Sequence, residues 1–342
     1  MDPGRVEMKK VVTFGEVMMR LSPPGHAKFS QVSALELAFG GGEANVAISL
    51  AYFGLSAAHV TRFPDNIIGR SATQFLRHHW LDTSEVIYGD NMMGIYFLEK
   101  GAVHRSSQVI YEREGSAFSK IEPGMINWEQ VLKNADWFHW TGITPAVSQG
   151  AAVCCKEAIE AANKLGVTVS ADIHSRSSLW NYGKTEKEVM PKLIGGCDVV
   201  LGSPRDICKL FNFELNDKQQ DFKAVSQKLI KMCPRIKKVV DKNRETVSAS
   251  HNRIQGKMWN GKYLFETPKL DVTHIIDRVG TGDAYAAGLI YGLLMYEDDV
   301  QSLKFATAAC ALKHTIEGDA NVVSLDDVQG LMKGDTSGRI HR

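Results

Sequence analysis

The sequence Asp277-Arg278-Val279-Gly280-Thr281-Gly282-Asp283 runs directly into the apolar stretch AYAAGLIYGLLM at residues 284–295, which predicts a helix from residue 283 onward. Gly280 and Gly282 permit backbone torsions that other residues resist, and they allow a ligand to approach the main chain closely. The start of a helix has unpaired N–H groups and the positive end of the helix dipole, which together favour an anion. The stretch therefore predicts an anion site formed by Gly280, Thr281, Gly282 and Asp283.

Asp283 has two explanations at this stage. Aspartate is among the best N-caps, so one explanation is that it only caps the helix. The other is catalytic, because a nest of N–H groups can neutralise a transferring phosphoryl group while an adjacent carboxylate accepts a hydroxyl proton. The local residues leave both open.

A second glycine-rich stretch, FGGGEANVA at residues 39–47, precedes a helix predicted at residues 43–53. Gly41 and Gly42 leave room for a polar ligand to touch the backbone, and Asn45 in the first helical turn can hydrogen-bond outward. The alternative is a tight strand-to-helix turn without a ligand. The G-x-G-x-x-G pattern of dinucleotide-binding proteins is absent from this stretch.

Around these stretches, β-rich runs alternate with helical patterns. Strands are predicted at residues 11–15, 59–63, 137–140, 167–172, 199–201 and 239–241, and helices at residues 43–53, 69–80, 149–165, 224–232, 283–295 and 301–315. The alternation predicts one α/β domain over residues 1–342, with a doubly wound, mostly parallel sheet flanked by helices.

Residues 18–39 and 83–119 interrupt this alternation. GIYFLEK at residues 94–100 and QVIYERE at residues 108–114 alternate in polarity, as antiparallel strands do. They predict a small β-sheet that forms a lid over the end of the main sheet. The alternative is a solvated edge hairpin. Exposed apolar lid strands also predict a homo-oligomer, a dimer or higher, formed through the lid.

Composition excludes several classes of protein. Of 342 residues, 44% are hydrophobic and 23% are charged, which excludes a largely disordered chain. The net charge of +1 excludes a global field that would attract nucleic acid or an anionic membrane. The six cysteines are scattered without C-x-x-C spacing, as is typical of free thiols in a reducing compartment, and no apolar run is long enough to span a bilayer. We therefore expect a cytoplasmic protein without nucleic-acid or membrane partners.

The two glycine-rich stretches resemble known signatures. GTGDAYAAG at residues 280–288 resembles the C-terminal signature of ribokinase-like (PfkB-type) sugar kinases, and FGGGEANVA resembles their N-terminal signature. The resemblance extends from about residue 10 to about residue 332. It implies the ribokinase-like fold, ATP and Mg²⁺ as cofactors, Asp283 as the general base, and phosphoryl binding by Gly280, Thr281 and Gly282.

Within this family, residues 111–117, 142–146 and 172–176 are most similar to 2-keto-3-deoxygluconate kinases. The resemblance implies a substrate site composed of Gly41, Gly42, Asn45, Tyr96, Tyr111, Arg113, Asp172 and Arg176. The chemistry agrees, since two arginines suit a carboxylate and Asp172 ends a strand, where open α/β sheets bind ligands. The alternatives are surface ion pairs for the arginines and a packing role within the lid for Tyr96.

The sequence departs from the family where nucleotide and metal are expected. The family has N-x-x-E where this chain has Ser203-Pro204-Arg205-Asp206, so Asp206 is expected to reach Mg²⁺ only through water, or the segment is only a capped helix start. The resemblance implies nucleotide contacts from Ser203, Lys242, Gly280, Gly282 and Gly318, with Lys242 in a loop after a strand. It also implies that some relatives bind a monovalent cation near Gly318.

The expected reaction is transfer of a phosphoryl group from ATP to the 6-hydroxyl of 2-dehydro-3-deoxy-D-gluconate, a small sugar acid. A kinase for a neutral sugar such as fructose or ribose is the first alternative. The second is a catalytically silent sugar-acid sensor on a kinase fold, because a fold does not determine function.

Overall fold

The computed structural model describes residues 8–174, 177–213 and 221–335. The strands of the main sheet within these residues are β1 (Lys10–Phe14), β4 (Ser56–Val60), β9 (Trp137–Thr141), β10 (Thr168–Asp172), β11 (Val199–Leu201), β12 (Lys238–Ser248), β13 (His251–Trp259), β14 (Leu264–Glu266) and β15 (Leu270–Val272). The main order is β14-β13-β12-β11-β10-β9-β1-β4, and β15 pairs with β13. Neighbours from β4 to β12 are parallel, whereas β13 to β15 form an antiparallel edge. The prediction of a mostly parallel α/β sheet is confirmed.

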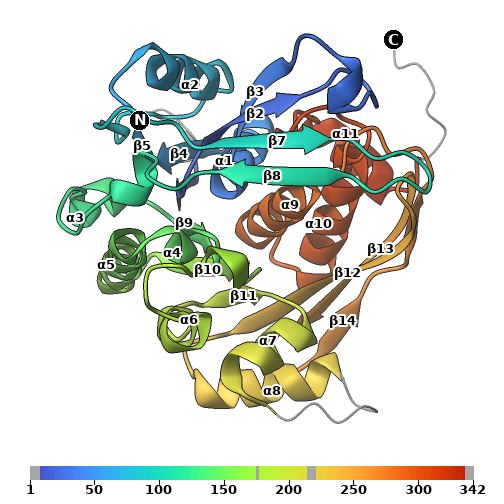
Figure 1. Cartoon of the computed structure of the whole chain (residues 1–342). Helices are drawn as coiled ribbons and strands as arrows, with labels where there is room; N and C mark the ends of the chain where they lie inside the picture. The colour runs from blue at the N-terminus through green and yellow to red at the C-terminus, as the bar shows by residue number, and fades with distance from the viewer. Residues whose placement is uncertain (1–7, 175–176, 214–220, 336–342) are drawn as a thin grey trace, which may run out of the picture.

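Helices cover both faces of this sheet (Figure 1). One layer contains α1 (Gly42–Tyr52), α2 (Ile67–His78), α9 (Thr281–Met295), α10 (Asp299–Lys313) and α11 (Leu325–Met332). The other contains α3 (Trp128–Leu132), α5 (Gln149–Leu165), α6 (Glu186–Ile194), α7 (Pro204–Phe211) and α8 (Phe222–Met232). Short turns of helix occur at α4 (Thr144–Val147), η1 (Phe29–Gln31), η2 (Phe118–Lys120) and η3 (Ser177–Leu179).

The two layers are separate because strand side chains alternate between the faces of the sheet. Val11 packs in the core that includes α1 and α9, whereas Val12 packs in the core that includes α5. All six cysteines are buried and free, in agreement with the sequence. No helix among the described residues is both long and apolar enough to cross a membrane.

A second, four-stranded sheet lies across the top of the molecule in the view of Figure 1. Its order is β3-β2-β7-β8, from β2 (Met18–Ser22), β3 (Glu36–Gly40), β7 (Ile95–Glu99) and β8 (Gln108–Glu112). β7 and β8 are antiparallel as predicted, but β2 and β7 are parallel, so this sheet is mixed. A short parallel pair, β5 (Arg62–Phe63) and β6 (Ile87–Tyr88), lies apart from both sheets.

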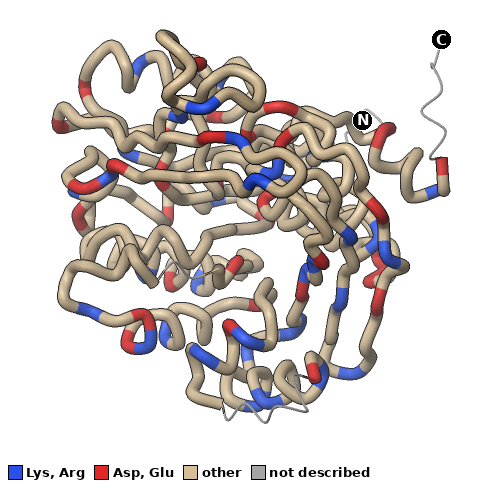
Figure 2. Tube along the Cα trace, turned by 45° about the vertical axis from the view of Figure 1, so that its right-hand side comes forward, with Lys and Arg blue, Asp and Glu red and all other residues tan. Residues whose placement is uncertain are grey.

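Two predicted strands differ markedly from the structure. The strand predicted at residues 59–63 is divided between β4 and β5. The strand predicted at residues 239–241 continues as β12 to Ser248 and turns back as β13, so Lys242 lies in a strand and not in a loop. Residues 242–246 are polar, which predicts a loop, yet antiparallel pairing with β13 satisfies backbone hydrogen bonds along this segment. Basic and acidic positions are mixed along the trace in the view of Figure 2, in agreement with the near-zero net charge.

Candidate active site

A cavity of about 1340 Å³ lies between the small sheet and the carboxyl ends of the parallel strands. It is lined by these predicted site residues: Gly41, Gly42, Asn45, Tyr96, Tyr111, Arg113, Asp172, Ser203, Asp206, Lys242, Gly280, Thr281, Gly282 and Asp283. Gly318 is not among the lining residues, and Arg176 lies outside the described residues. The carboxyl end of the strands is where open α/β sheets bind ligands. Folding therefore brings nearly all the predicted residues to one cavity.

The anion loop, residues 280–283, begins α9. Gly280 is the N-cap and has φ of 77°, and a Cβ atom there would lie 2.0 Å from the carbonyl oxygen of Asp319. A Cβ atom on Gly282 would lie 3.3 Å from the Lys242 ammonium, which therefore lies beside the loop. Thr281 is buried and its hydroxyl donates to the Arg278 carbonyl, at 3.0 Å. Gly280 is needed for the turn, because its φ is positive and the Asp319 carbonyl leaves no room for a Cβ atom.

Asp283 lies in the first turn of α9 but does not cap it, so the capping explanation is wrong. Its Oδ2 accepts a hydrogen bond from Asn45 Nδ2 at 2.7 Å, which joins the two glycine-rich stretches. Burial and the negative charges of Asp172, Asp319 and Glu43 raise the pKa of Asp283 to about 7, against the Asn45 hydrogen bond, which lowers it. A carboxylate with a pKa near neutrality suits proton abstraction.

Glu43, which the sequence did not single out, fixes the start of α1. Its buried carboxylate accepts from the Thr141 backbone N–H at 3.1 Å, the Thr141 hydroxyl at 2.7 Å and the Thr144 hydroxyl at 2.5 Å. Burial raises the pKa of this carboxyl. Gly41 approaches the Glu16 carbonyl so closely that a Cβ atom would lie 2.1 Å from it. The glycine stretch is thus a tight turn that also lines the cavity.

Arg113 lies in the cavity lining, and it is already paired there. Its Nε donates to Glu16 Oε2 at 2.8 Å, and its Nη2 forms a second bond to the same oxygen. Ser116 donates to the other oxygen of Glu16 at 2.6 Å. Arg113 is therefore held by a buried carboxylate, and its Nη1 has no hydrogen-bond partner among the described residues. The sequence missed Glu16 because the two residues are 97 positions apart.

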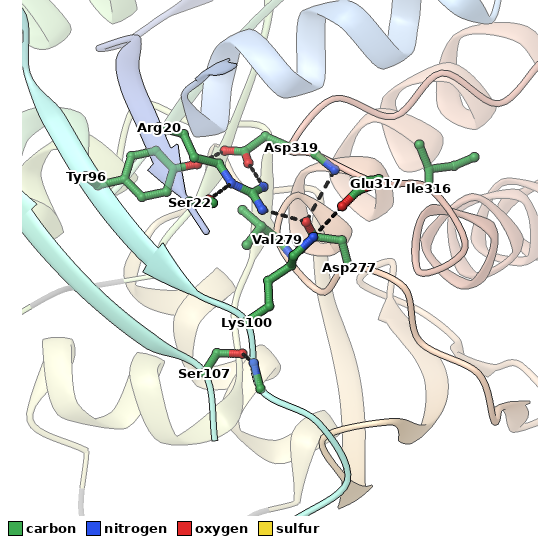
Figure 3. A network of polar contacts seen from close by, with 12 residues as sticks. Arg20, Ser22, Tyr96, Lys100, Ser107, Asp277, Val279, Ile316, Glu317 and Asp319 are labelled. Carbon is green, nitrogen blue, oxygen red and sulfur yellow. Dashed lines mark hydrogen bonds and ion pairs between the residues drawn. The ribbon is translucent and has the colours of Figure 1, made fainter. Parts of the chain in front are cut away.

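Tyr96 belongs to a buried network that joins the small sheet to the C-terminal loops (Figure 3). Its hydroxyl donates to Asp319, which also accepts from Arg20 Nη1 at 2.6 Å. Arg20 Nη2 bonds Asp277 at 2.8 Å, and Asp277 accepts from the Val279 N–H at 3.0 Å. Tyr96 is therefore buried and held by Asp319, and because it also lines the cavity, its contact with a substrate stays a prediction.

Tyr111 and Asp172 border the cavity from opposite sides. The Tyr111 ring lies 5.8 Å from the ring of Tyr96. Asp172 Oδ1 accepts from the backbone N–H of His174 at 3.1 Å and bonds its ring nitrogen at 3.2 Å. Burial pushes the pKa of Asp172 up, but His174 and Lys242 together hold it below its ordinary value. Asp172 is thus an ionised group near the Lys242 ammonium.

Ser203 and Asp206 form the capped helix start that the sequence offered as an alternative. The Ser203 hydroxyl accepts from the Asp206 N–H at 3.2 Å and bonds its carboxylate at 2.6 Å, with Pro204 in the first turn of α7. No group of three or more acidic, histidine or cysteine side chains in the described ranges is placed to hold a metal ion alone. Mg²⁺ commonly binds through one or two carboxylates, substrate phosphates and water, and a single Asp206 at the cavity fits that mode.

Gly318 lies in a turn behind the anion loop, with φ of 82°. Its N–H donates to Asp277 at 3.3 Å, and its carbonyl accepts from the Lys313 ammonium at 2.8 Å. Its predicted nucleotide contact therefore finds no support in the cavity lining. Arg244 and Arg278 also line the cavity, together with Lys242, whose ammonium lies beside the anion loop. The sequence predicted no role for Arg278, and the three cations together suit the phosphates of a nucleotide.

A profile of the pfkB family carbohydrate kinases matches residues 8–324, which is most of the chain. The chain belongs to the PfkB family of carbohydrate kinases. Among the most similar proteins is a 2-dehydro-3-deoxygalactonokinase of Haloferax volcanii, 30% identical over 329 residues, which are 96% of this chain and 98% of that protein. The family resemblance inferred from the two glycine-rich stretches is confirmed.

Solved structures of PfkB kinases share the fold. A 2-dehydro-3-deoxygluconokinase from Thermotoga maritima is 37% identical and superposes with a TM-score of 0.91, covering 96% of this chain and 99% of that one. A fructokinase from Xylella fastidiosa with bound ATP is 20% identical, with a TM-score of 0.79, covering 97% and 100% of the two chains. The ribokinase-like fold predicted from the sequence is confirmed.

Proposed function

We propose that this PfkB kinase transfers the γ-phosphoryl group of ATP to the 6-hydroxyl of 2-dehydro-3-deoxy-D-gluconate. The observation that carries the proposal is the Asn45–Asp283 pair at the anion loop, in a cavity that also contains Arg113. The named relatives that act on dehydro-deoxy sugar acids support the acid substrate.

Asp283 takes the proton from the attacking hydroxyl in this proposal. The N–H groups of residues 280–283 hold the transferring phosphoryl group, and the Lys242 ammonium beside Gly282 binds a phosphate oxygen. Mg²⁺ bound to the ATP phosphates would neutralise the charge that develops during transfer, with Asp206 reaching it through water. The two glycine turns then hold the attacking hydroxyl and the phosphoryl group in position for transfer.

The sugar acid is held on the other side of Asp283. Asn45 donates one amide hydrogen to Asp283, and its buried Oδ1 has no partner among the described residues, so it is free to accept from a sugar hydroxyl. Arg113 directs its remaining N–H groups to the substrate carboxylate, with Tyr111 at the edge. Backbone atoms of Gly41 and Gly42 and the carboxylate of Asp172 complete the set, and Arg176 remains a predicted second carboxylate contact.

The small sheet acts as a lid that excludes water and limits ATP hydrolysis. Its outer strand β8 lies at the edge of the sheet that the described residues form, and Val109 and Ile110 on it are 41% and 58% accessible. A second copy of the chain is the proposed occupant of this edge, which gives a homo-oligomer, measurable by light scattering. The use of ATP supports a cytoplasmic location in this proposal.

A neutral-sugar kinase is the second candidate, because Glu16 already neutralises Arg113. ADP release with ATP and Mg²⁺ separates the two on a panel of 2-keto-3-deoxygluconate, 2-keto-3-deoxygalactonate, fructose, ribose and no sugar. Turnover only with the keto acids supports the proposal, and the two epimers rank the stereochemical preference. Turnover only with fructose or ribose overturns the acid substrate. Binding of keto acid in calorimetry without any turnover would favour the sensor.

A further inference from the structure

Lys313 is a lysine without solvent exposure at the end of α10. Its ammonium donates to the carbonyl of Ile316 at 2.9 Å and to the carbonyl of Gly318 at 2.8 Å. The side chain thus turns into the loop that follows its own helix. A fully buried lysine is rare unless its charge is compensated, so this placement needs a reason.

The charges around Lys313 supply part of that reason. Burial lowers the pKa of Lys313, and the nearby charges of Asp277 and Asp319 oppose this effect by favouring the charged form. Arg20 binds one oxygen of each of these two carboxylates. Two buried carboxylates are therefore balanced by two buried cations, Arg20 and Lys313. Without the lysine, the cluster would keep one uncompensated negative charge.

The lysine also supports the anion loop directly. A Cβ atom on Gly280 would lie 3.3 Å from Lys313 Cε and 2.0 Å from the Asp319 carbonyl, so the lysine stem and the Asp319 backbone pack beneath Gly280. Asp277 accepts from the N–H groups of both Val279 and Gly318, which ties the anion loop to the loop that the ammonium holds. Displacement of Lys313 would therefore shift the groups that bind the phosphoryl group.

Backbone carbonyls around one positive charge also form the environment that a dehydrated monovalent cation requires. The resemblance implied such a cation near Gly318 in some relatives, but here the carbonyls of Ile316 and Gly318 already accept from the Lys313 ammonium. These residues therefore do not fit a bound monovalent cation. We propose that Lys313 is a positioning residue whose ammonium serves as a built-in cation, so that this kinase needs no K⁺ or Na⁺. The proposal rests on the kinase function proposed above.

The first test uses the wild-type protein and needs no variant. Rates with Mg-ATP are compared in chloride salts of K⁺, Na⁺ and tetramethylammonium at equal ionic strength, with whichever sugar the protein phosphorylates. Equal rates within about twofold are expected, because the positive charge is covalently attached. Activation of several-fold by K⁺ would overturn the proposal. The thermal midpoint in the same salts needs no substrate, so it tests the proposal even if no sugar is turned over. A specific increase in this midpoint by K⁺ would equally overturn it.

The second test creates space for an external cation. Lys313→Ala is expected to lose about tenfold or more in kcat through misplacement of the loop, and to regain activity and thermal midpoint with K⁺, NH₄⁺ or methylammonium. Lys313→Met removes the charge but fills the space, so it should lose activity without any rescue. Lys304→Met removes a partly exposed lysine charge from the same helix and should match the wild type. Wild-type activity of Lys313→Met, or equal response of both Lys313 variants to all salts, would refute a built-in cation.

Discussion

Asp283→Asn removes the proposed base while it keeps a group of the same size beside Asn45. Loss of a positioned general base lowers kcat by about 10² or more. The pH dependence of kcat/KM of the wild-type enzyme should also show this base. Because burial raises the pKa of Asp283 to about 7, kcat/KM should fall about tenfold per pH unit below that value and level off above it.

Asp283→Asn is expected to lower the activity but to raise the stability of the folded protein. The pKa of Asp283 is raised from 3.8 to about 7 on folding, so its stabilising effect is complete below the unfolded-state pKa and is lost as the pH rises through 7. At pH 8 the ionised carboxylate costs at most about 4 kcal/mol, because a pKa change of one is worth about 1.4 kcal/mol. Asp283→Asn should therefore be more stable than the wild type at pH 8.

The assay combines steady-state kinetics from pH 5.5 to about 9 with urea unfolding at pH 8. Asn45→Ala is the matched control, since it removes the hydrogen bond that lowers the pKa of Asp283 and should move the acidic limb to higher pH. An inactive Asp283→Asn protein that is also less stable would indicate misfolding. Near-normal kcat in that variant, or a flat wild-type profile between pH 6 and 8, would refute the role of the base.

Three further predictions concern the groups around this base. Arg113→Lys keeps the charge that balances Glu16 but loses the bidentate guanidinium donor. The KM for a keto acid should therefore rise about tenfold or more, while the KM for a neutral sugar stays unchanged. Equal effects on both KM values would contradict the carboxylate contact. Arg20→Met leaves Asp277 and Asp319 buried without this partner, so the free energy of unfolding measured by urea titration should fall by about 3–5 kcal/mol. A decrease below about 1 kcal/mol would contradict the buried network. Gly280→Ala should lower kcat by about 10²-fold, because the φ of residue 280 is positive and an added Cβ atom would meet the Asp319 carbonyl. Gly166→Ala is the control, since Gly166 also has a positive φ, of 75°, but has open space around it. This control variant should lose only about 1 kcal/mol of stability.

Local features of the sequence account for much of this structure. The helix predicted at residues 149–165 has those bounds in α5, because Ser148 caps its start and Gly166 ends it in the left-handed conformation. Strands β7 and β8 of the small sheet were predicted from their alternating polarity. In contrast, α6 was missed because Pro191 lies inside it, and β13 was missed because its polar partner strand resembled a loop.

The sequence by itself determined the family, the two glycine turns and the carboxylate that ends the anion loop. Such features depend on torsions and periodicities that operate within a few residues. Only the tertiary structure decided which charges meet. Arg20 binds Asp319 across 299 positions, and Arg113 binds Glu16 across 97. Burial then sets the pKa of Asp283 and leaves Lys313 inside a loop of carbonyls, because desolvation and pairing depend on neighbours that adjacent residues do not specify.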